Sequence, residues 1–174
     1  VHKAFDERLA ILTGDALMVL AFQVLAERAE RHPERLAPLT LAIGRGVGLP
    51  KGIIPGQAWE CETGVALDQY QREKTGALFA AAAAGGAAAA GVNDDAWRRF
   101  GECLGEAYQV ADDLRDVVAN EQELGKPIGQ DEALDRPSAA RELGLAGAKQ
   151  RLEDLLAEAG RIIPACPGEG ELRA

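Results

Sequence analysis

Apolar side chains recur at intervals of three and four residues through the middle of the chain, and this spacing constrains the fold most strongly. The positions are Trp97, Phe100, Leu104, Ala107, Ala111, Leu114 and Val118. An α-helix returns to the same face after three or four residues, so the spacing predicts one amphipathic helix of about 25 residues. Asn93 or Asp94 is the expected N-cap, and Gly125 and Pro127 interrupt the pattern beyond the helix.

The rest of the chain carries further helical patterns and no alternation typical of a strand. Ala is abundant and aromatic residues make up only 5% of the chain, a mixture that favours helix over sheet. Helices are predicted over residues 5–31, 33–44, 57–62, 67–90 and 139–163, with a loop or broken helix over the Gly- and Pro-rich residues 44–56. The first of these is apolar all round at residues 16–22, which predicts a central, buried helix. The expected fold class is all-α.

Charge and composition exclude several classes of protein. The net charge of −9, without a basic cluster, argues against nucleic-acid binding, because phosphate contacts need clustered Lys and Arg. Three widely spaced cysteines, Cys61, Cys103 and Cys166, are interpreted as reduced and mostly structural. The Ala- and Gly-rich run at residues 76–92 is too short and too weakly apolar for a membrane span, so we expect a buried bundle helix there. No signal peptide is recognisable, and these features predict a cytoplasmic protein without a transmembrane segment.

The amphipathic helix also carries an acidic cluster. At about 100° per residue, Gln109, Asp112, Asp113 and Asp116 share one arc of about 100° beside the apolar stripe. Carboxylates held this close repel one another, and a divalent cation would relieve the repulsion. Mg2+ binds through one or two carboxylates and keeps waters and substrate phosphates in its shell. The cluster therefore predicts a Mg2+ site, with a solvated acidic face as the alternative interpretation.

Two cationic segments accompany the acidic cluster. Lys74-Thr75-Gly76 follows a polar stretch, and a Lys and a Thr hydroxyl can bind a phosphate together. Lys126 and Arg136 lie in the segment directly after the acidic helix. Each segment alone is explained as well by ordinary surface cations. Together with the acidic cluster, they predict a site where a metal ion and cations bind a diphosphate.

In these motifs the chain resembles the trans-prenyl diphosphate synthases, most closely bacterial geranylgeranyl diphosphate synthases. The resemblance runs nearly from end to end. The matching motifs are the segment of residues 1–17, Gly56-Gln57, Lys74-Thr75-Gly76, Gln109 through Asp116, and Gly125-Lys126.

The resemblance implies both an activity and a fold. The enzyme would condense an allylic diphosphate, geranyl or farnesyl, with isopentenyl diphosphate to give a longer diphosphate, geranylgeranyl diphosphate. The metal ion and cations would stabilise the leaving diphosphate, in a site kept dry to protect a carbocation. The family fold is an antiparallel helical bundle around a central cavity, usually paired as a homodimer.

The resemblance also assigns roles to residues. It gives Mg2+ binding to Asp112, Asp113 and Asp116. It gives diphosphate binding to Lys74, Lys126 and Arg136. It names Lys74, Thr75 and Gln109 as catalytic residues, of which Thr75 and Gln109 would steady the carbocation.

The chain departs from the family pattern in several places. No second D-D-x-x-D occurs, so residues 1–174 lack the family's first aspartate-rich motif and the arginines after it. We therefore expect a single isoprenoid-synthase domain without its N-terminal helices and that motif. Glu60 stands where the family has Asp, Arg136 where a second loop lysine is usual, and Tyr108 where Phe is usual.

Three alternative functions remain open at this point. A non-catalytic or regulatory subunit of a heteromeric synthase would explain the missing first motif, but the intact Lys74 and acidic cluster weigh against it. A terpene cyclase usually adds an Asn/Asp-rich motif with Ser or Thr, which Asn93-Asp94-Asp95 lacks. A di-metal carboxylate bundle needs Glu-x-x-His pairs, and neither His2 nor His32 has a Glu three residues before it.

Overall fold

The computed structural model describes residues 2–62, 64, 66–118 and 138–173. The described residues form helices and no strand, which confirms the all-α prediction. The chain separates into two compact units, residues 1–41 and residues 42–174, and each is described by itself. The expected single domain over residues 1–174 stays a prediction.

The first unit consists mainly of helix α1 (Glu7–Arg28). Asp6 caps it, since its Oδ1 accepts a hydrogen bond of 2.8 Å from the Leu9 N–H. The short turns η1 (Ala29–Arg31) and η2 (Pro33–Arg35) follow, separated by His32. The predicted helix over residues 5–31 therefore exists, with its first two and last three residues outside the α-helical part.

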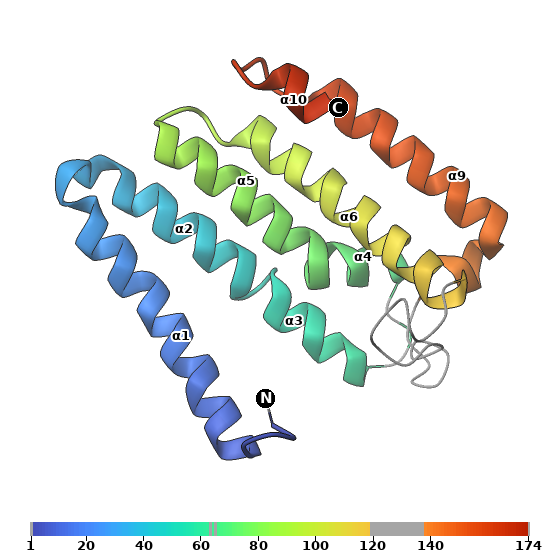
Figure 1. Cartoon of the computed structure of the whole chain (residues 1–174), viewed down its shortest axis with the longest axis horizontal. Coiled ribbons are helices and arrows are strands. Elements are labelled where there is room, and N and C mark those ends of the chain that lie inside the picture. The colour runs from blue at the N-terminus through green and yellow to red at the C-terminus, as the bar shows by residue number, and fades with distance from the viewer. Residues whose placement is uncertain (1, 63, 65, 119–137, 174) are drawn as a thin grey trace. The chain divides into compact units, whose positions relative to one another are not determined.

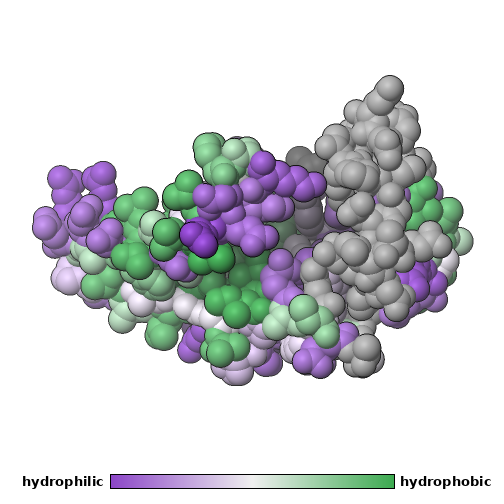
Figure 2. Space-filling view, turned by 90° about the horizontal axis from the view of Figure 1, so that it is seen from below, coloured by the Kyte–Doolittle hydropathy of each residue, from purple (hydrophilic) through white to green (hydrophobic). Residues whose placement is uncertain are grey.

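The burial predicted for this helix is not found among the described residues. No residue of α1 is buried, and large apolar side chains lie on its surface. Figure 2 shows hydrophobic residues, in green, beside hydrophilic ones, in purple, on the face of the molecule in view. By length and composition α1 could also cross a membrane, the one described helix for which this holds, although core helices of soluble proteins pass the same test. The Ala-rich run discussed above is not such a helix.

The second unit begins within helix α2 (Leu36–Val47), which passes through Gly44 and Gly46. The predicted end at Gly44 is therefore wrong by three residues. A Cβ on Gly46 would lie 2.4 Å from the Ala81 Cβ, so this glycine lets α2 approach helix α5 (Ala77–Ala90) closely. A glycine within a helix lowers the stability of that helix, and here the close packing of α2 on α5 offsets the loss. The local sequence does not show this packing.

The chain then forms a series of short elements that lead into α5. They are α3 (Ile53–Ala58), η3 (Trp59–Cys61), α4 (Leu67–Gln71) and the π-helical turn η4 (Arg72–Gly76). Helices α4, η4 and α5 join without interruption, as the prediction of one helix over residues 67–90 requires. Gly91, at φ 76°, ends α5 in the left-handed conformation that glycine adopts without strain.

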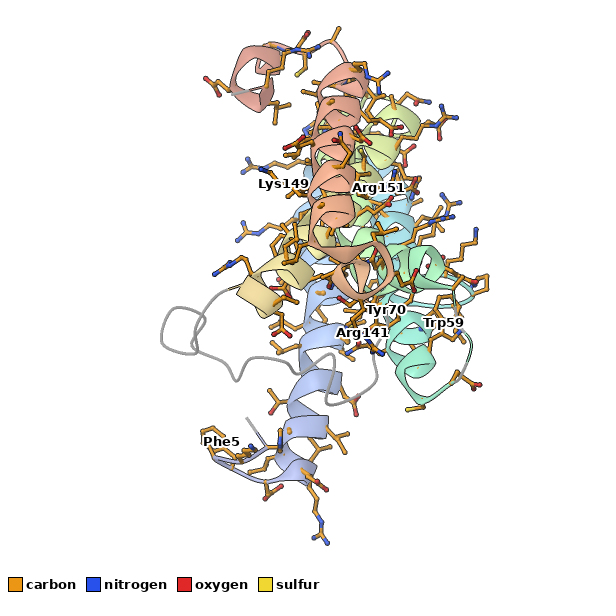
Figure 3. All side chains as sticks on the ribbon, turned by 90° about the vertical axis from the view of Figure 1, so that its right-hand side faces the viewer. Phe5, Trp59, Tyr70, Arg141, Lys149 and Arg151 are labelled. Carbon is orange, nitrogen blue, oxygen red and sulfur yellow. The ribbon has the colours of Figure 1, made fainter. Side chains whose placement is uncertain are left out.

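Helix α6 (Asp95–Val118) is the centre of this unit, with α5 on one side and helix α9 (Ala139–Ile162) on the other (Figure 1). Its predicted apolar stripe faces α9. The core between these helices includes Phe100, Cys103, Ala107 and Val110 of α6 and Ala148, Leu155 and Ala159 of α9. On the outside, Arg151 Nε of α9 donates to Glu106 Oε1 of α6 at 3.1 Å (Figure 3).

Helix α9 differs from the prediction in one detail. Gly144 has φ 69° and ψ 166°, so the helix is broken there although both parts follow the predicted range. Helix α10 (Glu169–Arg173) closes the described chain.

Candidate active site

The π-helical turn η4 carries Lys74 and Thr75, and neighbouring elements hold its backbone tightly. The Ala77 N–H bonds to the Arg72 carbonyl five residues earlier, which is the π-helical pattern. Such single π-turns occur often at functional sites. A Cβ on Gly56 would lie 2.4 Å from the Lys74 N, so α3 packs directly on this backbone. Gly56 belongs to the Gly-Gln motif, and this contact explains why a glycine stands there.

Glu73 fastens the turn to the start of α3. Its carboxylate is buried, and Oε2 accepts a hydrogen bond of 2.7 Å from the Gly52 N–H. Gly52 has φ 140°, a conformation that favours glycine. Sequence reasoning missed Glu73, because nothing in the local pattern distinguishes it from the solvent-exposed charges around it.

The acidic helix α6 touches the same turn through a pair of glycines. A Cβ on Gly105 would lie 2.5 Å from the Gly76 Cα, so the two backbones are in direct contact. The sequence places Gly76 one residue after Thr75 and Gly105 four residues before Gln109. This contact therefore brings the Lys-Thr segment and the acidic segment together, although about 35 residues separate them in the sequence.

A chain of hydrogen bonds connects the two segments. Thr75 Oγ1 donates to Gln109 Oε1 at 2.7 Å, and Gln109 Nε2 donates to Asp113 Oδ1 at 2.9 Å. The hydroxyl and the carboxylate thus fix the orientation of the Gln109 amide, since its oxygen accepts and its nitrogen donates. Thr75 and Gln109, the two residues to which the resemblance gives the role of steadying the carbocation, both belong to this series of hydrogen bonds.

The three aspartates of the cluster have different surroundings. Asp113 is 1% exposed, and it also accepts hydrogen bonds at Oδ2 from Gln71 Nε2 at 2.9 Å and from the Ala139 N–H at 2.7 Å. Asp116 is 6% exposed, and Asp112 is half-buried. Asp113 is therefore engaged by three N–H donors within the protein.

The donor set fits a Mg2+ ion that takes few ligands from the protein. Among the described residues, no group of three or more His, Cys, Asp or Glu side chains converges as a metal cage. Mg2+ does not need one, since it commonly binds one or two carboxylates and completes its shell with water and substrate phosphates. Asp112 and Asp116 supply the hard oxygen donors that such an ion prefers.

A pocket of about 470 Å3 lies beside Lys74 and Thr75. Its other lining residues are Ile53, Gln57, Leu78, Phe79 and Tyr108. The centres of the Phe79 and Tyr108 rings lie 5.4 Å apart, and the two rings form one wall of the pocket. The pocket thus places the Lys74 ammonium group and the Thr75 hydroxyl next to an apolar surface. Leu78 and Phe79 follow Thr75 by three and four residues, and this helical spacing could have predicted their position.

The ammonium group of Lys74 has a partner on its own helix. Lys74 Nζ donates to the Tyr70 hydroxyl at 2.6 Å and lies 4.9 Å from the centre of the Tyr70 ring. The ring is buried, and it supports the charge through a cation–π contact. Tyr70 therefore holds Lys74 at the rim of the pocket, a role that sequence reasoning did not assign.

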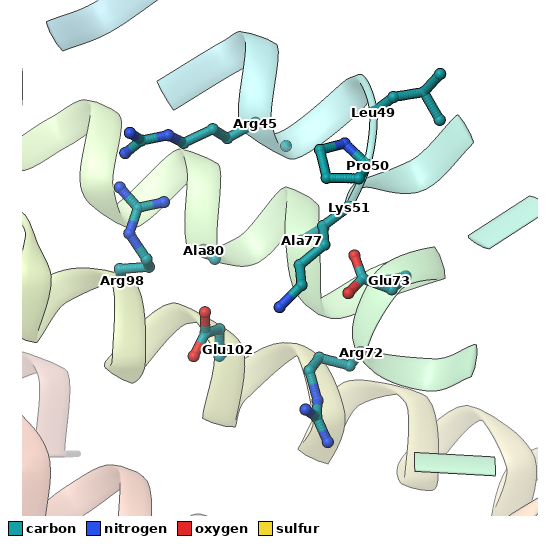
Figure 4. A pocket seen from close by; sticks show the side chains of 11 residues that line it. Arg45, Leu49, Pro50, Lys51, Arg72, Glu73, Ala77, Ala80, Arg98 and Glu102 are labelled. Carbon is teal, nitrogen blue, oxygen red and sulfur yellow. The ribbon is translucent and has the colours of Figure 1, made fainter. Parts of the chain in front are cut away.

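A second pocket, of about 370 Å3, lies against Arg72 and Glu73 (Figure 4). Its charged lining residues are Arg45, Lys51, Arg72, Glu73, Arg98 and Glu102. Charges of both signs meet here, and at least Arg98 is paired outside the lining, with Asp94 at 2.7 Å. Four successive residues of η4 are thus divided between two pockets, Arg72 and Glu73 in this one and Lys74 and Thr75 in the other.

Three predicted residues are not placed by the structure. Lys126 and Arg136 lie outside the described residues, as does the side chain of Glu60. Their predicted contributions to the site stay predictions.

Comparison with known proteins identifies the family. The family model described as polyprenyl synthetase matches residues 1–162. The chain belongs to the polyprenyl synthetase family. The resemblance drawn from the sequence motifs is thereby confirmed.

Among curated relatives of this polyprenyl synthetase chain, two bacterial geranylgeranyl diphosphate synthases are similar over 99% of its length. The Cereibacter sphaeroides protein is 51% identical over 172 residues, and the Rhodobacter capsulatus protein is 45% identical over 172 residues. The chain spans about 60% of the length of each of these relatives.

Solved structures of polyprenyl synthetase relatives agree with the fold. A Helicobacter pylori geranyltransferase complexed with magnesium and isoprenyl diphosphate matches 99% of this chain and 59% of its own, with 28% identity and a TM-score of 0.83. A Zymomonas mobilis FPP/GFPP synthase matches 99% of this chain and 61% of its own, with 28% identity and a TM-score of 0.80. The predicted isoprenoid-synthase type of all-α fold is confirmed.

Proposed function

We propose that this polyprenyl synthetase is a prenyltransferase that condenses an allylic diphosphate with isopentenyl diphosphate to give geranylgeranyl diphosphate. The observation that supports this most directly is the pocket that Lys74 and Thr75 share with an apolar wall, joined through Gln109 to the acidic end of α6. The similarity to two geranylgeranyl diphosphate synthases supports the product.

Each residue of the site has a part in the proposed reaction. Asp112 and Asp116 would hold Mg2+, which neutralises charge on the leaving diphosphate when bound. Lys74 would place a positive charge beside that diphosphate, and Lys126 and Arg136 are proposed to add to it. Thr75 and Gln109, oriented by their mutual hydrogen bond, would present fixed dipoles to the cationic carbon.

The apolar wall has a separate part. Leu78 and the paired rings of Phe79 and Tyr108 would surround the prenyl chain and limit the access of water to a carbocation. We further propose that the protein acts as a cytoplasmic homodimer, and that residues 42–174 contribute the acidic and lysine half of its active site.

The experiment uses the full natural chain with Mg2+, isopentenyl diphosphate and farnesyl diphosphate, and it measures product length. A C20 diphosphate is expected. Asp112→Ala should abolish it, whereas Asp154→Ala, an exposed aspartate of α9, should leave it unchanged. A folded, dimeric protein that forms no product would instead indicate the non-catalytic or regulatory subunit of a heteromeric synthase.

A further inference from the structure

Gln71 is a buried amide that no sequence motif singled out. It is the last residue of α4, directly before the π-helical turn, and it is 3% exposed. Its Nε2 donates to Asp113 Oδ2 at 2.9 Å, which joins residues 42 positions apart. A polar side chain buried this deeply is expensive unless it is hydrogen-bonded, so the bond to Asp113 explains its presence.

Asp113 connects Gln71 through Gln109 to Thr75, which lines the pocket. One carboxylate oxygen accepts from Gln71 and from the backbone of Ala139, and the other accepts from Gln109. Gln109 in turn accepts from Thr75. A buried carboxylate is tolerated because several N–H donors satisfy it, and removing one donor leaves charge without full compensation.

We propose that Gln71 is a positioning residue of the prenyl transfer site, acting through Asp113 on the orientation of Gln109 and Thr75. The proposal rests on the proposed function. Gln71 is not among the described residues that line the pocket, so its effect must pass through others. Without the Gln71 N–H, Asp113 Oδ2 keeps only the Ala139 N–H of these two donors, so the carboxylate that orients the Gln109 amide is held less firmly.

The test compares two Gln-to-Met substitutions in the full natural chain. Gln71→Met keeps the length of the side chain and removes the donor. Gln150→Met is the matched control, because Gln150 Nε2 donates to Asp154 Oδ1 at 3.1 Å on the exposed surface of α9. We expect Gln71→Met to lower kcat roughly 10–100-fold, as for a lost hydrogen bond to a charged group. The KM for isopentenyl diphosphate and the kcat of the control should stay within about twofold.

A double substitution separates positioning from a merely structural role. If Gln71 acts through Gln109, then Gln71→Met should change kcat less than about twofold in a Gln109→Leu background. Effects that multiply, or a kcat per folded protein that Gln71→Met leaves unchanged, would overturn the proposal. If Gln71→Met does not fold, Gln71→Asn is measured instead. It keeps the amide donor on a shorter side chain, and the same changes in kcat, alone and in the Gln109→Leu background, decide the proposal.

The outcome distinguishes this proposal from the proposed function. If the function is wrong, the unsubstituted protein forms no prenyl diphosphate. If only the positioning role is wrong, the unsubstituted protein is active, Asp112→Ala abolishes the activity, and Gln71→Met retains it.

Discussion

The three aspartates of the acidic cluster differ in burial, since Asp113 and Asp116 are buried and Asp112 is half-buried. Sequence spacing places Asp112, Asp113 and Asp116 on one arc and treats them alike. In the structure Asp113 accepts hydrogen bonds from Gln71, Gln109 and Ala139. Gln71 and Ala139 come from segments distant in the sequence, so helical periodicity cannot reveal these two partners. Asp113 is thus better understood as the support for Gln109 than as a first choice of metal ligand.

The thiol of Cys103 is predicted to resist alkylation. It is buried against α9, and its Sγ donates to the Leu155 carbonyl at 3.2 Å. Burial, with Glu158 and Glu106 nearby, raises the pKa of the Cys103 thiol, so less of the reactive thiolate forms at a given pH. With iodoacetamide at pH 8, the exposed Cys61 should react first, and Cys103 only after unfolding.

The same shift has a consequence for stability. Because the folded-state pKa is raised, the contribution of Cys103 to the free energy of unfolding is fully present below the thiol's ordinary pKa of about 8.5. It is lost as pH rises through the higher folded value.

For the alkylation prediction, peptide mapping after timed labelling gives the order in which the cysteines are modified. Equal labelling rates for Cys61 and Cys103 in the folded protein would contradict the burial described here.

At the scale of elements, close contact between α5 and α6 depends on glycines. A Cβ on Gly101 would lie 2.4 Å from the Phe79 carbonyl oxygen and 2.7 Å from the Ala80 Cα. Backbone atoms cannot move aside as a flexible side chain can, so Gly101→Ala should force the helices apart. We expect a loss of about 1–3 kcal/mol in the free energy of unfolding, measured by chemical denaturation.

Gly85 provides the control for this prediction. It lies within α5, and apart from the neighbouring backbone of its own helix, no heavy atom of the described residues would come within 4 Å of an added Cβ. Gly85→Ala should therefore be neutral or stabilising by up to about 1 kcal/mol, because Ala is the better helix former. If both substitutions destabilised the protein equally, the close α5–α6 contact at Gly101 would not explain the loss.

The sequence predicts most elements of the second unit, for a physical reason. The apolar stripe of α6 is long and regular, and it packs against α9 as its spacing indicates. The end of α2 was misplaced because Gly46 serves contact with Ala81 and not chain termination. The π-turn at Arg72–Gly76 was not foreseen, because a change from the i−4 to the i−5 hydrogen bond leaves the residue pattern unaltered.

At the scale of the whole molecule, net charge sets the conditions for ligand binding. A protein of net charge −9 repels a diphosphate at long range, so binding should depend on a divalent cation at the acidic end of α6. Inorganic diphosphate with Mg2+ is expected to raise the Tm of the full natural chain by roughly 2–6 °C. Thermal unfolding should show no such rise with EDTA or in Asp112→Ala.

The control replaces Mg2+ by NaCl at matched ionic strength, so that screening alone is measured. A diphosphate-induced rise in Tm that persists with EDTA would mean that the cations of the site are sufficient, and that the carboxylates have another role.

The sequence alone predicts the fold class and the acidic and lysine motifs of this site. It predicts that α1 is buried, whereas no described residue of that helix is buried.

The π-helical turn also changes the angular phase of the helix that runs from Leu67 to Ala90. Its wider hydrogen-bonded ring adds one residue without breaking the helix, which rotates the side chains of α4 by about 100° relative to those of α5. One continuous helix can therefore present Gln71 to Asp113 before the turn and pack closely on the α6 glycines after it. Deleting a single residue of the turn would restore the α-helical phase and rotate Gln71 and Tyr70 away from their partners, even with every side chain of the site still present in the sequence.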